Sequence, residues 1–419
     1  MKATFAPGVH DRAALGPDDV SDTELAAMVA DLWDAPAVEL LGSAAEVVDY
    51  HVPSILTGAR TWVRGHADAG DGPRQFALFV KRVHSWRHSP AFASVPPEIG
   101  EWAATAVPWR AEPLIYASDL ADRLPEGLTM PRAVRIDERP DETAVIWMEA
   151  AEASSEPWDR EAYVEAAGLL GRMTGSDRVA ELAAIDPLPW HIHYFVQGRL
   201  GQTVLPGLYD DATWQHELVA PYFSDLRPHL TAVANHLDAL AEEFARLPHR
   251  TSHGDACPNN LLRHPSGAGF TLIDFGFWRP QPVGFDLSQL LVGDIQIGRR
   301  DAEDLPELAE ACLTAYAAGL LAEGHLVDDA VLRRGHAVSL MLFNGLPSLP
   351  LEQVEEVERL AAAGELTDGR LAAMHDWSLQ RSRVARYALE VLEETDRWIS
   401  LPAASYASST SDRPSVRGD

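Results

Sequence analysis

The sequence predicts an α+β fold of two lobes, a small antiparallel β-rich N-lobe followed by a larger, mainly helical C-lobe. Three observations support this prediction. Short β-branched and aromatic runs separated by glycine-containing turns fill residues 47–82, and helix-spaced apolar residues dominate from about residue 157. A short hairpin pattern then interrupts the helices at residues 261–273. A chain of 419 residues is long enough for such a bilobal core.

The predicted division of the chain follows these changes of pattern. We expect a helical extension at residues 1–40, the N-lobe at 41–151, the C-lobe at 152–400 and a disordered, Ser/Pro-rich tail at 401–419. Helix-spaced apolar residues follow a Ser/Asp start signal over residues 21–49. The predicted strands are VVDYHVPSIL, TWVRGHA, FALFVKRV, AVRID and TAVIWMEAA.

The C-lobe is expected to consist of amphipathic helices, with apolar residues at i, i+3 and i+4. The segments that carry this pattern are 159–175, 226–248, 305–324, 330–343, 351–364 and 382–399. A further helix-like segment, 113–125, is expected within the N-lobe, after a Pro- and Trp-rich stretch.

Composition and charge exclude several classes of function. The net charge of −29 argues against nucleic-acid binding, which depends on Lys and Arg neutralising phosphate. The same charge is compatible with a cationic small substrate or simply with a solvated acidic surface. Two cysteines exclude a disulfide framework, and no secretory or membrane-spanning run is present. We therefore expect a cytoplasmic protein without a membrane partner, and the sequence leaves monomer and homodimer open.

The stretch TSHGDACPNNLLRHPSGAGFTLIDFGFWRPQPVGFDL, residues 251–287, has the strongest chemical pattern in the chain. A hairpin with HPSGAG as its turn would bring Asn260, just before the first strand, close to Asp274, at the end of the second. Mg²⁺ prefers oxygen ligands and commonly takes one or two carboxylates together with substrate phosphates. The pattern therefore predicts a Mg²⁺ site at Asn260 and Asp274, with Asp255 free to face an incoming hydroxyl.

HGDACPNN, followed nineteen residues after its Asp by IDFG, resembles the catalytic and magnesium loops of the protein-kinase-like fold. In detail it is similar to the aminoglycoside phosphotransferase family, whose likeness extends over roughly residues 40–390. The resemblance implies that Asp255 is the catalytic base, that Asn260 and Asp274 are Mg²⁺ ligands, and that His253 stabilises the loop. It also implies that Asp286, in GFDLSQLL, braces the catalytic loop.

The resemblance further implies a lysine on the third strand of the N-lobe that reaches the nucleotide phosphates. FALFVKRV supplies Lys81, the only lysine besides Lys2. An exposed strand lysine is the alternative interpretation. A glutamate on the next helix should pair with this lysine, and Glu112 is the first choice with Glu101 second. The separation of Glu112 from Lys81 along the chain is longer than the family usually shows, so the resemblance implies an insertion at residues 84–108.

Two other nucleotide contacts are implied by the same resemblance. The loop that covers the phosphates would be ILTGARTW, with Gly58 at its tip, although it lacks a glycine-rich motif. The hinge between the lobes should follow VIWMEAA, where backbone groups around Glu149 and Ala151 would bind a purine base.

Two departures from protein kinases point to a small-molecule acceptor. The position two residues after the catalytic Asp, a lysine in those kinases, is Cys257, and only twelve residues separate Asp274 from Asp286, too few to hold a protein substrate. Cys257 has no assigned base, so a packed thiol is the better interpretation than a nucleophile.

PWHIHYF contains the remaining candidate site residues. His191 and His193 stand two apart, the spacing of a metal pair on one strand face, but no further ligand follows at metal-site spacing. We instead expect His191, His193 and Tyr194 to line the acceptor pocket.

The sequence thus predicts a small-molecule kinase that transfers the γ-phosphoryl group of ATP or GTP to a hydroxyl, with Mg²⁺ as cofactor. The resemblance implies a small acceptor, since the family includes kinases of aminoglycosides, other antibiotics, choline, sugars and amino acids. The acidic balance of the chain mildly favours a cationic acceptor among these. Asp255 would act with an ordinary low pKa. The alternative is a nucleotide-binding pseudokinase that serves as a regulatory or interaction module, which the poor glycine loop and the uncertain glutamate partner favour.

Overall fold

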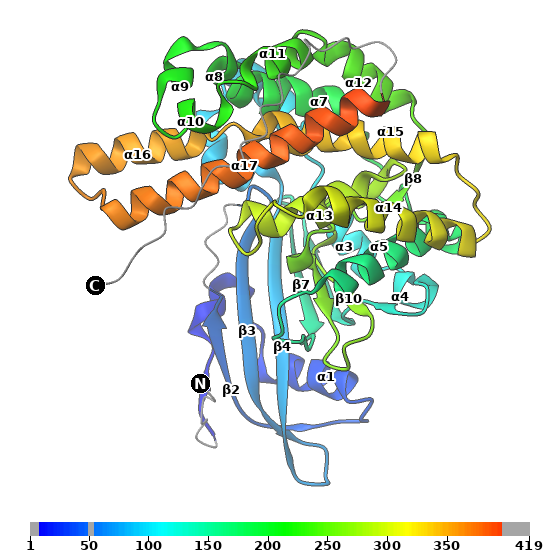
Figure 1. Cartoon of the computed structure of the whole chain (residues 1–419). Helices are drawn as coiled ribbons and strands as arrows, with labels where there is room; N and C mark the ends of the chain where they lie inside the picture. Colours follow the sequence, from blue (N-terminus) through cyan, green and yellow to red (C-terminus); the bar gives the residue numbers. More distant parts are fainter. Residues whose placement is uncertain (1–7, 49–53, 396–419) are drawn as a thin grey trace, which may run out of the picture.

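A twisted sheet and a group of helices form two lobes that meet at a short β-hairpin (Figure 1). The structure is a computed structural model, and it describes residues 8–48 and 54–395. The predicted α+β class, with an antiparallel-rich N-terminal sheet and a helical C-terminal part, is confirmed. The expected tail at 401–419 and part of the first expected strand lie outside the described residues.

The small lobe contains a six-stranded sheet in the order β1-β2-β3-β4-β7-β6, antiparallel except for the pair of β1 and β2. Alternate residues of the long hairpin β3–β4 are buried, because one face of it packs on the core and the other does not. The strands are β1 His10–Asp11, β2 Glu39–Val47, β3 Thr57–Asp68, β4 Pro73–His84, β6 Ala133–Arg139 and β7 Thr143–Glu149.

The helical pattern over residues 21–49 is only partly correct. Helix α1 (Asp22–Leu32) begins at a capping box, in which the Ser21 side chain accepts from the Glu24 backbone and the Glu24 side chain accepts from that of Ser21. The helix ends before Asp34, which has a positive φ of 51°. Residues 39–47 are then strand β2, because pairing with β3 satisfies their backbone groups.

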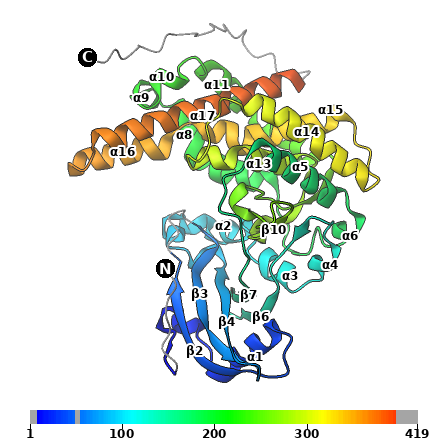
Figure 2. The same ribbon diagram turned by 60° about the horizontal axis from the view of Figure 1, so that its bottom comes forward.

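The segment between the sheet and the large lobe contains short helices. The stretch expected to be an insertion holds η2 (Trp86–His88), η3 (Pro90–Ser94), η4 (Pro97–Ile99) and α2 (Gly100–Ala106). Two helices, α3 (Ala111–Tyr116) and α4 (Leu120–Arg123), replace the single expected helix at 113–125. Figure 2 shows α3 and strand β10 at the junction of the two lobes.

The large lobe is built around α13, most of whose residues are buried. Helices α5 and α14 cross closely because glycines stand at the contact: a Cβ on Gly171 would lie 2.2 Å from the carbonyl oxygen of Tyr316. The expected helix at 226–248 breaks into α11 and α12 at His236, and α17 begins fourteen residues earlier than expected, at Asp368.

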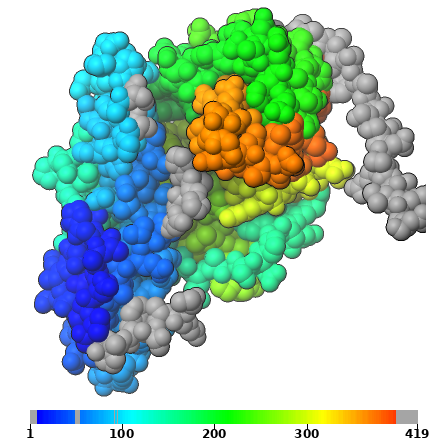
Figure 3. Space-filling model, turned by 90° about the vertical axis from the view of Figure 1, so that its left-hand side faces the viewer, coloured from blue at the N-terminus to red at the C-terminus, as the bar shows by residue number. Residues whose placement is uncertain are grey.

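The helices of this lobe are α5 Arg160–Gly175, α6 Asp177–Ala180, α7 Ile192–Phe195, α8 Leu205–Tyr209, α9 Asp211–Gln215, α10 Ala220–Phe223, α11 Arg227–Asn235, α12 Leu237–Arg246, α13 Phe285–Gln296, α14 Leu305–Ala322, α15 Asp329–Leu340, α16 Leu351–Ala363 and α17 Asp368–Thr395. Two π-helical segments, Val196–Val204 and Met341–Gly345, extend α7 and α15. In Figure 3 the orange pair α16–α17 lies beside the green helices, on the face that looks toward the viewer.

The predicted hairpin is present between the lobes. Strands β9 (Leu261–Arg263) and β10 (Phe270–Leu272) pair antiparallel, and β10 also pairs with β5 (Leu128–Thr129). A second ribbon, β8 (His249–Ser252) with β11 (Arg279–Pro282), leads into and out of the loops that carry the candidate site. Within the described part of the chain, no helix is long and apolar enough to cross a membrane.

Candidate active site

Lys81 lies at the centre of the small-lobe sheet, on β4 between β3 and β7. Its side chain is buried, and its Nζ atom is 2.7 Å from Oε2 of Glu112 and 2.9 Å from Oδ1 of Asp274. Burial lowers the pKa of Lys81, but the charges of Asp274 and Glu112 outweigh burial and raise that pKa above its ordinary value. The lysine is therefore a fixed cation between the sheet and the loop after β10.

Glu112, not Glu101, is the glutamate that contacts Lys81. Glu112 stands in the first turn of α3 and is 2% exposed, and burial raises its pKa to about 7 against the opposing effect of Lys81. Glu101 lies on α2 and pairs instead with Arg87, with its side chain 87% exposed. The fold thus brings together two residues that are 31 positions apart.

Asp255 is held by Asn260 in the loop between β8 and β9. The Nδ2 group of Asn260 donates to the backbone oxygen and to Oδ2 of Asp255, both at 2.9 Å. Burial, with the nearby charge of Asp274, raises the pKa of Asp255 to about 7. The expectation of an ordinary low pKa was therefore wrong, because sequence spacing does not report how far the loop is buried.

Two residues brace this loop from behind. Asp286, at the start of α13, accepts from the Ser252 hydroxyl at 2.7 Å and from the backbone N–H groups of His253 and Gly254 at 3.0 and 2.9 Å. His253 is fully buried, and its Nε2 group lies 3.0 Å from the carbonyl oxygen of Ile273, next to Asp274. Burial lowers the pKa of His253, so the neutral ring, with Nε2–H donating, suits this position.

Backbone geometry also positions the two loops. Asp274 has a left-handed conformation with a φ of 64°, which is uncommon outside glycine and turns its side chain toward Lys81. Gly254 has a φ of 84°, and a Cβ there would lie 2.1 Å from the carbonyl oxygen of Phe277. The loop before β9 and the loop after β10 are thus packed backbone to backbone.

The donor set suits Mg²⁺. The amide nitrogen of Asn260 faces Asp255, so the Oδ1 atom of the same amide faces away from Asp255 and can accept or coordinate. The pairing of β9 with β10 brings Asn260, before β9, close to Asp274, after β10. Burial would raise the pKa of Asp274, but Lys81 and Arg60 lower it below its ordinary value, so the carboxylate is ionised and could serve as a cation ligand. Among the described residues, no cluster of three or more His, Cys, Asp or Glu forms a metal site by itself, so phosphate oxygens would complete this one.

The three residues expected to contact the nucleotide, Gly58, Glu149 and Ala151, lie in three different parts of the fold. Gly58 lies at a bulge at the start of β3, not at the tip of a loop, and it packs against His84. Glu149 ends β7; its backbone N–H donates to Arg132, and its carboxylate accepts from the Arg132 N–H at 2.8 Å. Ala151 follows in the irregular segment that leads to α5. A cavity of about 460 Å³ lies between residues 153–158 of this segment and the β9 residues that follow Asn260.

The segment with His191, His193 and Tyr194 caps and starts helix α7 instead of forming a strand. His191 and His193 line a cavity of about 580 Å³, to which β11 contributes the facing wall. Tyr194 is not among the lining residues; its ring contacts His191 and, at 5.7 Å between centroids, Trp102 of α2.

Apart from His191 and His193, sequence reasoning singled out none of the residues that line this cavity, among them Trp190, Arg279 and Gln281. Arg279 follows Asp274 by five residues, so proximity to the metal-binding motif was the available signal. Cys257 is a packed thiol, because burial raises its pKa and its Cβ faces Gly293 of α13.

Comparison with known proteins agrees with this geometry. The phosphotransferase enzyme family matches residues 38–326 of the chain. Among solved structures, the amicoumacin kinase hAmiN, in complex with AMP-PNP, Ca²⁺ and Ami, is 14% identical, with 84% of this chain and 88% of that chain covered and a TM-score of 0.50. At this identity the likeness supports the fold alone.

Two further structures are similar at lower scores. An aminoglycoside phosphotransferase from Alicyclobacillus acidocaldarius is 14% identical over 83% of this chain and 92% of that one, with a TM-score of 0.48. An ethanolamine kinase from Plasmodium vivax is 10% identical over 84% of each chain, with a TM-score of 0.40. No curated protein sequence matches the chain. On the family match, the predicted resemblance is confirmed: the chain belongs to the phosphotransferase enzyme family and is a phosphotransferase acting on hydroxyl groups of small molecules.

Proposed function

We propose that this protein is a small-molecule kinase that transfers the γ-phosphoryl group of ATP or GTP to a hydroxyl of its acceptor. The observation that supports this most is the meeting of Lys81 with Glu112 and Asp274 beside the Asp255–Asn260 pair. Phosphoryl transfer depends on positioning the reactants and on neutralising the charge of the phosphates. A fixed lysine next to oxygen donors that could hold a metal ion would provide both. The amicoumacin kinase structure contains a nucleotide analogue, which supports a nucleotide co-substrate here.

In this proposal each residue has one task. Lys81, held by Glu112, binds the nucleotide phosphates, while Asn260 and Asp274 would hold Mg²⁺, which when bound neutralises phosphate charge. Asp255 orients the acceptor hydroxyl and accepts its proton, a role that its pKa of about 7 suits because the ideal base titrates near the working pH. His253 and Asp286 keep the loop in place.

The nucleotide and the acceptor would approach from different sides. Backbone groups of Glu149 and Ala151 would bind the purine, with the residues after them lining the 460 Å³ cavity next to β9. The acceptor would bind in the 580 Å³ cavity that His191 and His193 line, with Tyr194 supporting their segment. Strand β11 connects this cavity to Asp274, and its partner β8 leads to Asp255.

The contact of Lys81 with Glu112 removes one of the two observations that favoured a pseudokinase. The experiment that separates the two functions uses the full chain with Mg²⁺-ATP or Mg²⁺-GTP and a panel of aminoglycosides, amino alcohols, sugars, hydroxy acids and nucleosides. A panel member that gains one phosphoryl group by mass, only when divalent cation and nucleotide are both present, would support the kinase. Nucleotide binding without any phosphorylated panel member or nucleotide hydrolysis would support the pseudokinase.

A further inference from the structure

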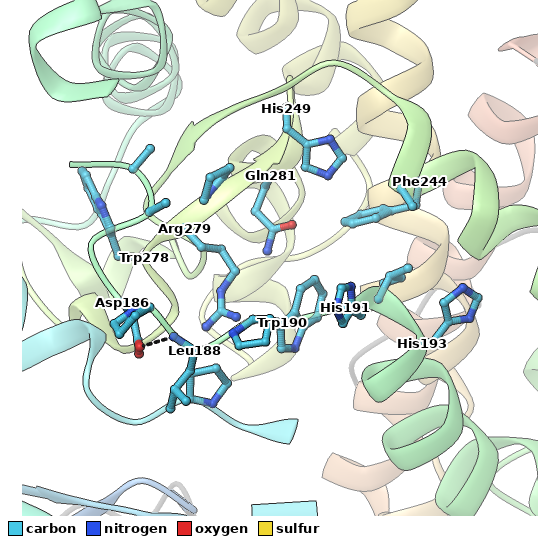
Figure 4. Close-up of a pocket in the computed structure, with 18 residues that line it drawn as sticks. Asp186, Leu188, Trp190, His191, His193, Phe244, His249, Trp278, Arg279 and Gln281 are labelled. Carbon is cyan, nitrogen blue, oxygen red and sulfur yellow. Dashed lines mark hydrogen bonds between the residues drawn. The ribbon is translucent and has the colours of Figure 1, made fainter. Parts of the chain in front are cut away.

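The 580 Å³ cavity has an unusual lining for a chain of net charge −29. Figure 4 shows that Arg279 and Gln281 of β11 point into the cavity, opposite the segment that contains Trp190. Much of the remaining wall is apolar, with Phe244, Trp278 and several prolines. The cavity therefore combines a largely apolar body with the guanidinium of Arg279, and the carboxylate of Asp186 also lines it.

Among the described residues, no carboxylate forms an ion pair with Arg279. Its guanidinium lies 5.1 Å from the centroid of the Trp190 ring, and its Nε group is 3.4 Å from the carbonyl oxygen of Phe277. In the parts of the chain that the structure describes, it forms no ion pair. Burial lowers its pKa to about 10, with Asp186 opposing this at longer range, so the group is still cationic at neutral pH. Arg279 is half-buried, and a partly desolvated cation without an ionic partner is costly, which favours a ligand that supplies the missing charge.

Asp186 does not fill that role in the structure. Its Oδ1 atom accepts from the backbone N–H of Leu188 at 2.9 Å, and Figure 4 shows this contact beside Arg279. Its other oxygen is buried without a hydrogen-bond partner. Most other arginines of the small and large lobes have an acidic partner; Arg227, which also lies over a tryptophan ring, pairs with Asp211.

Gln281 provides a second, independent polar group. It stands two residues after Arg279 on β11, so both side chains leave the same face of the ribbon. Only 4% of Gln281 is exposed, and its Oε1 atom has no hydrogen-bond partner. A buried amide oxygen without a partner is uncommon in a folded protein, because it loses its hydrogen bonds to water without replacement. The oxygen itself could only accept, but a half-turn of the amide would place the Nε2 group there instead, and beside Arg279 that group could donate to the same anion.

We propose that Arg279 and Gln281 form an anion subsite of the acceptor cavity, which takes the carboxylate or phosphate group of a small organic acceptor with an apolar or aromatic body. Trp190 would lie against that body or against the planar anion–guanidinium pair. The inference rests on the proposed function only in calling the ligand an acceptor. It differs from the cationic acceptor expected from net charge, because a guanidinium inside the cavity acts on a ligand at shorter range than a screened surface charge does.

The position of the subsite fits an acceptor. Arg279 pairs with Ser252 across the β8–β11 ribbon, three residues before Asp255. A ligand whose anionic group binds Arg279 can therefore extend along the β8–β11 ribbon, so that a hydroxyl at its other end lies toward the catalytic loop.

Thermal unfolding of the full chain tests this subsite without turnover. Four ligands with the same ring are compared in the presence of saturating Mg²⁺-AMP-PNP: benzoate, phenyl phosphate, benzyl alcohol and benzylamine. We expect benzoate or phenyl phosphate to raise the Tm with saturation, and the neutral and cationic ligands to leave it unchanged. The two anions distinguish a carboxylate-binding from a phosphate-binding subsite.

Variants assign the effect to Arg279. Arg279→Gln should lose the anion-dependent rise in Tm, while Arg279→Lys should retain part of it. The matched control Arg227→Gln removes another arginine over a tryptophan and should respond like wild type. Among the described residues Arg279 has no ion pair to lose, only its contacts with the Trp190 ring and the Phe277 carbonyl, so the Tm of Arg279→Gln without ligand should be close to that of wild type.

Three results would overturn the inference: an equal anion response in Arg279→Gln and wild type, an equal response to benzylamine and benzoate, or a large fall in the unliganded Tm of Arg279→Gln. Its failure is separable from that of the proposed function. If the protein phosphorylates some acceptor but no anion binds at Arg279, only the anion-subsite proposal is contradicted. If an anion binds at Arg279 but no acceptor is phosphorylated, only the kinase proposal is contradicted.

Discussion

The Nζ atom of Lys81 lies 2.8 Å from Oε1 and 2.7 Å from Oε2 of Glu112, so the ammonium group spans both oxygens of one buried carboxylate. Helix α3 carries this glutamate to the sheet after the 84–108 segment, and the other side of the ammonium faces Asp274. The contact connects the sheet, the helix and the loop after β10 through a single side chain.

Glu112→Gln should weaken this connection. We expect a loss of about 1–2 kcal/mol in the free energy of unfolding, since a neutral hydrogen bond replaces an ionic one. With only Asp274 left as an anionic partner, Lys81 should be drawn away from the phosphates, raising the KM for nucleotide about tenfold. The control is Glu101→Gln, whose exposed side chain pairs with Arg87. Equal effects of the two substitutions on KM would contradict the assignment.

Gly254→Ala should damage the catalytic loop by a steric clash. The new Cβ would meet the Phe277 carbonyl oxygen at 2.1 Å, and alanine would have to adopt the positive φ of 84° that glycine tolerates there, so we expect a loss of about 3–5 kcal/mol. Gly267→Ala is the matched control, with a similar φ of 81° and no atom within 4 Å of its Cβ, and should cost about 1 kcal/mol. Chemical denaturation measures both, and similar losses would show that the close packing of the loops is unimportant.

The rate should fall as the pH is lowered through about 7. The pKa of Asp255 is raised to about 7, so its carboxylate is protonated below that pH and cannot accept the acceptor's proton. We expect log kcat/KM to decline by about one unit per pH unit on the acid side. Glu112 titrates in the same range, with a pKa of about 7. The pH–rate profile of Glu112→Gln distinguishes the two groups. If the fall in rate near pH 7 persists in this variant, it belongs to Asp255, and if it disappears, the prediction is contradicted.

Asn260→Ala should raise the Mg²⁺ concentration that gives half-maximal activity by about tenfold or more, because it removes one proposed ligand. Asn259→Ala is a neighbouring control, since the Asn259 side chain accepts from Arg299 instead of contacting Asp255. A Mg²⁺ titration of activity measures both variants. If the two behave alike, Asn260 does not hold the cation.

The fold class and the motif residues could be predicted from the sequence because their signals are local. Asp255, Asn260 and Asp274 lie on one hairpin and its preceding loop, so turn composition and spacing were enough to bring them together. Lys81 also follows from a local strand pattern. The strand at 39–47 was missed for the opposite reason: its apolar residues fit helical spacing as well, and only pairing with β3 decides between the two.

Other features depend on distant packing. The choice between Glu112 and Glu101 is made by how the 84–108 segment folds, which no short pattern reports. The pKa of Asp255 depends on burial by several elements. Arg279 and Gln281 were missed because the face of β11 that meets the cavity is set by its register with β8.

The most direct test of the central claim is the rate of phosphoryl transfer by Asp255→Asn, measured together with nucleotide affinity. The substitution keeps the size of the side chain and removes the base, so the account predicts a fall in kcat of at least about a hundredfold with nucleotide affinity little changed. A variant that retains kcat within a few-fold of wild type would contradict the assignment of Asp255 as the residue that receives the acceptor's proton.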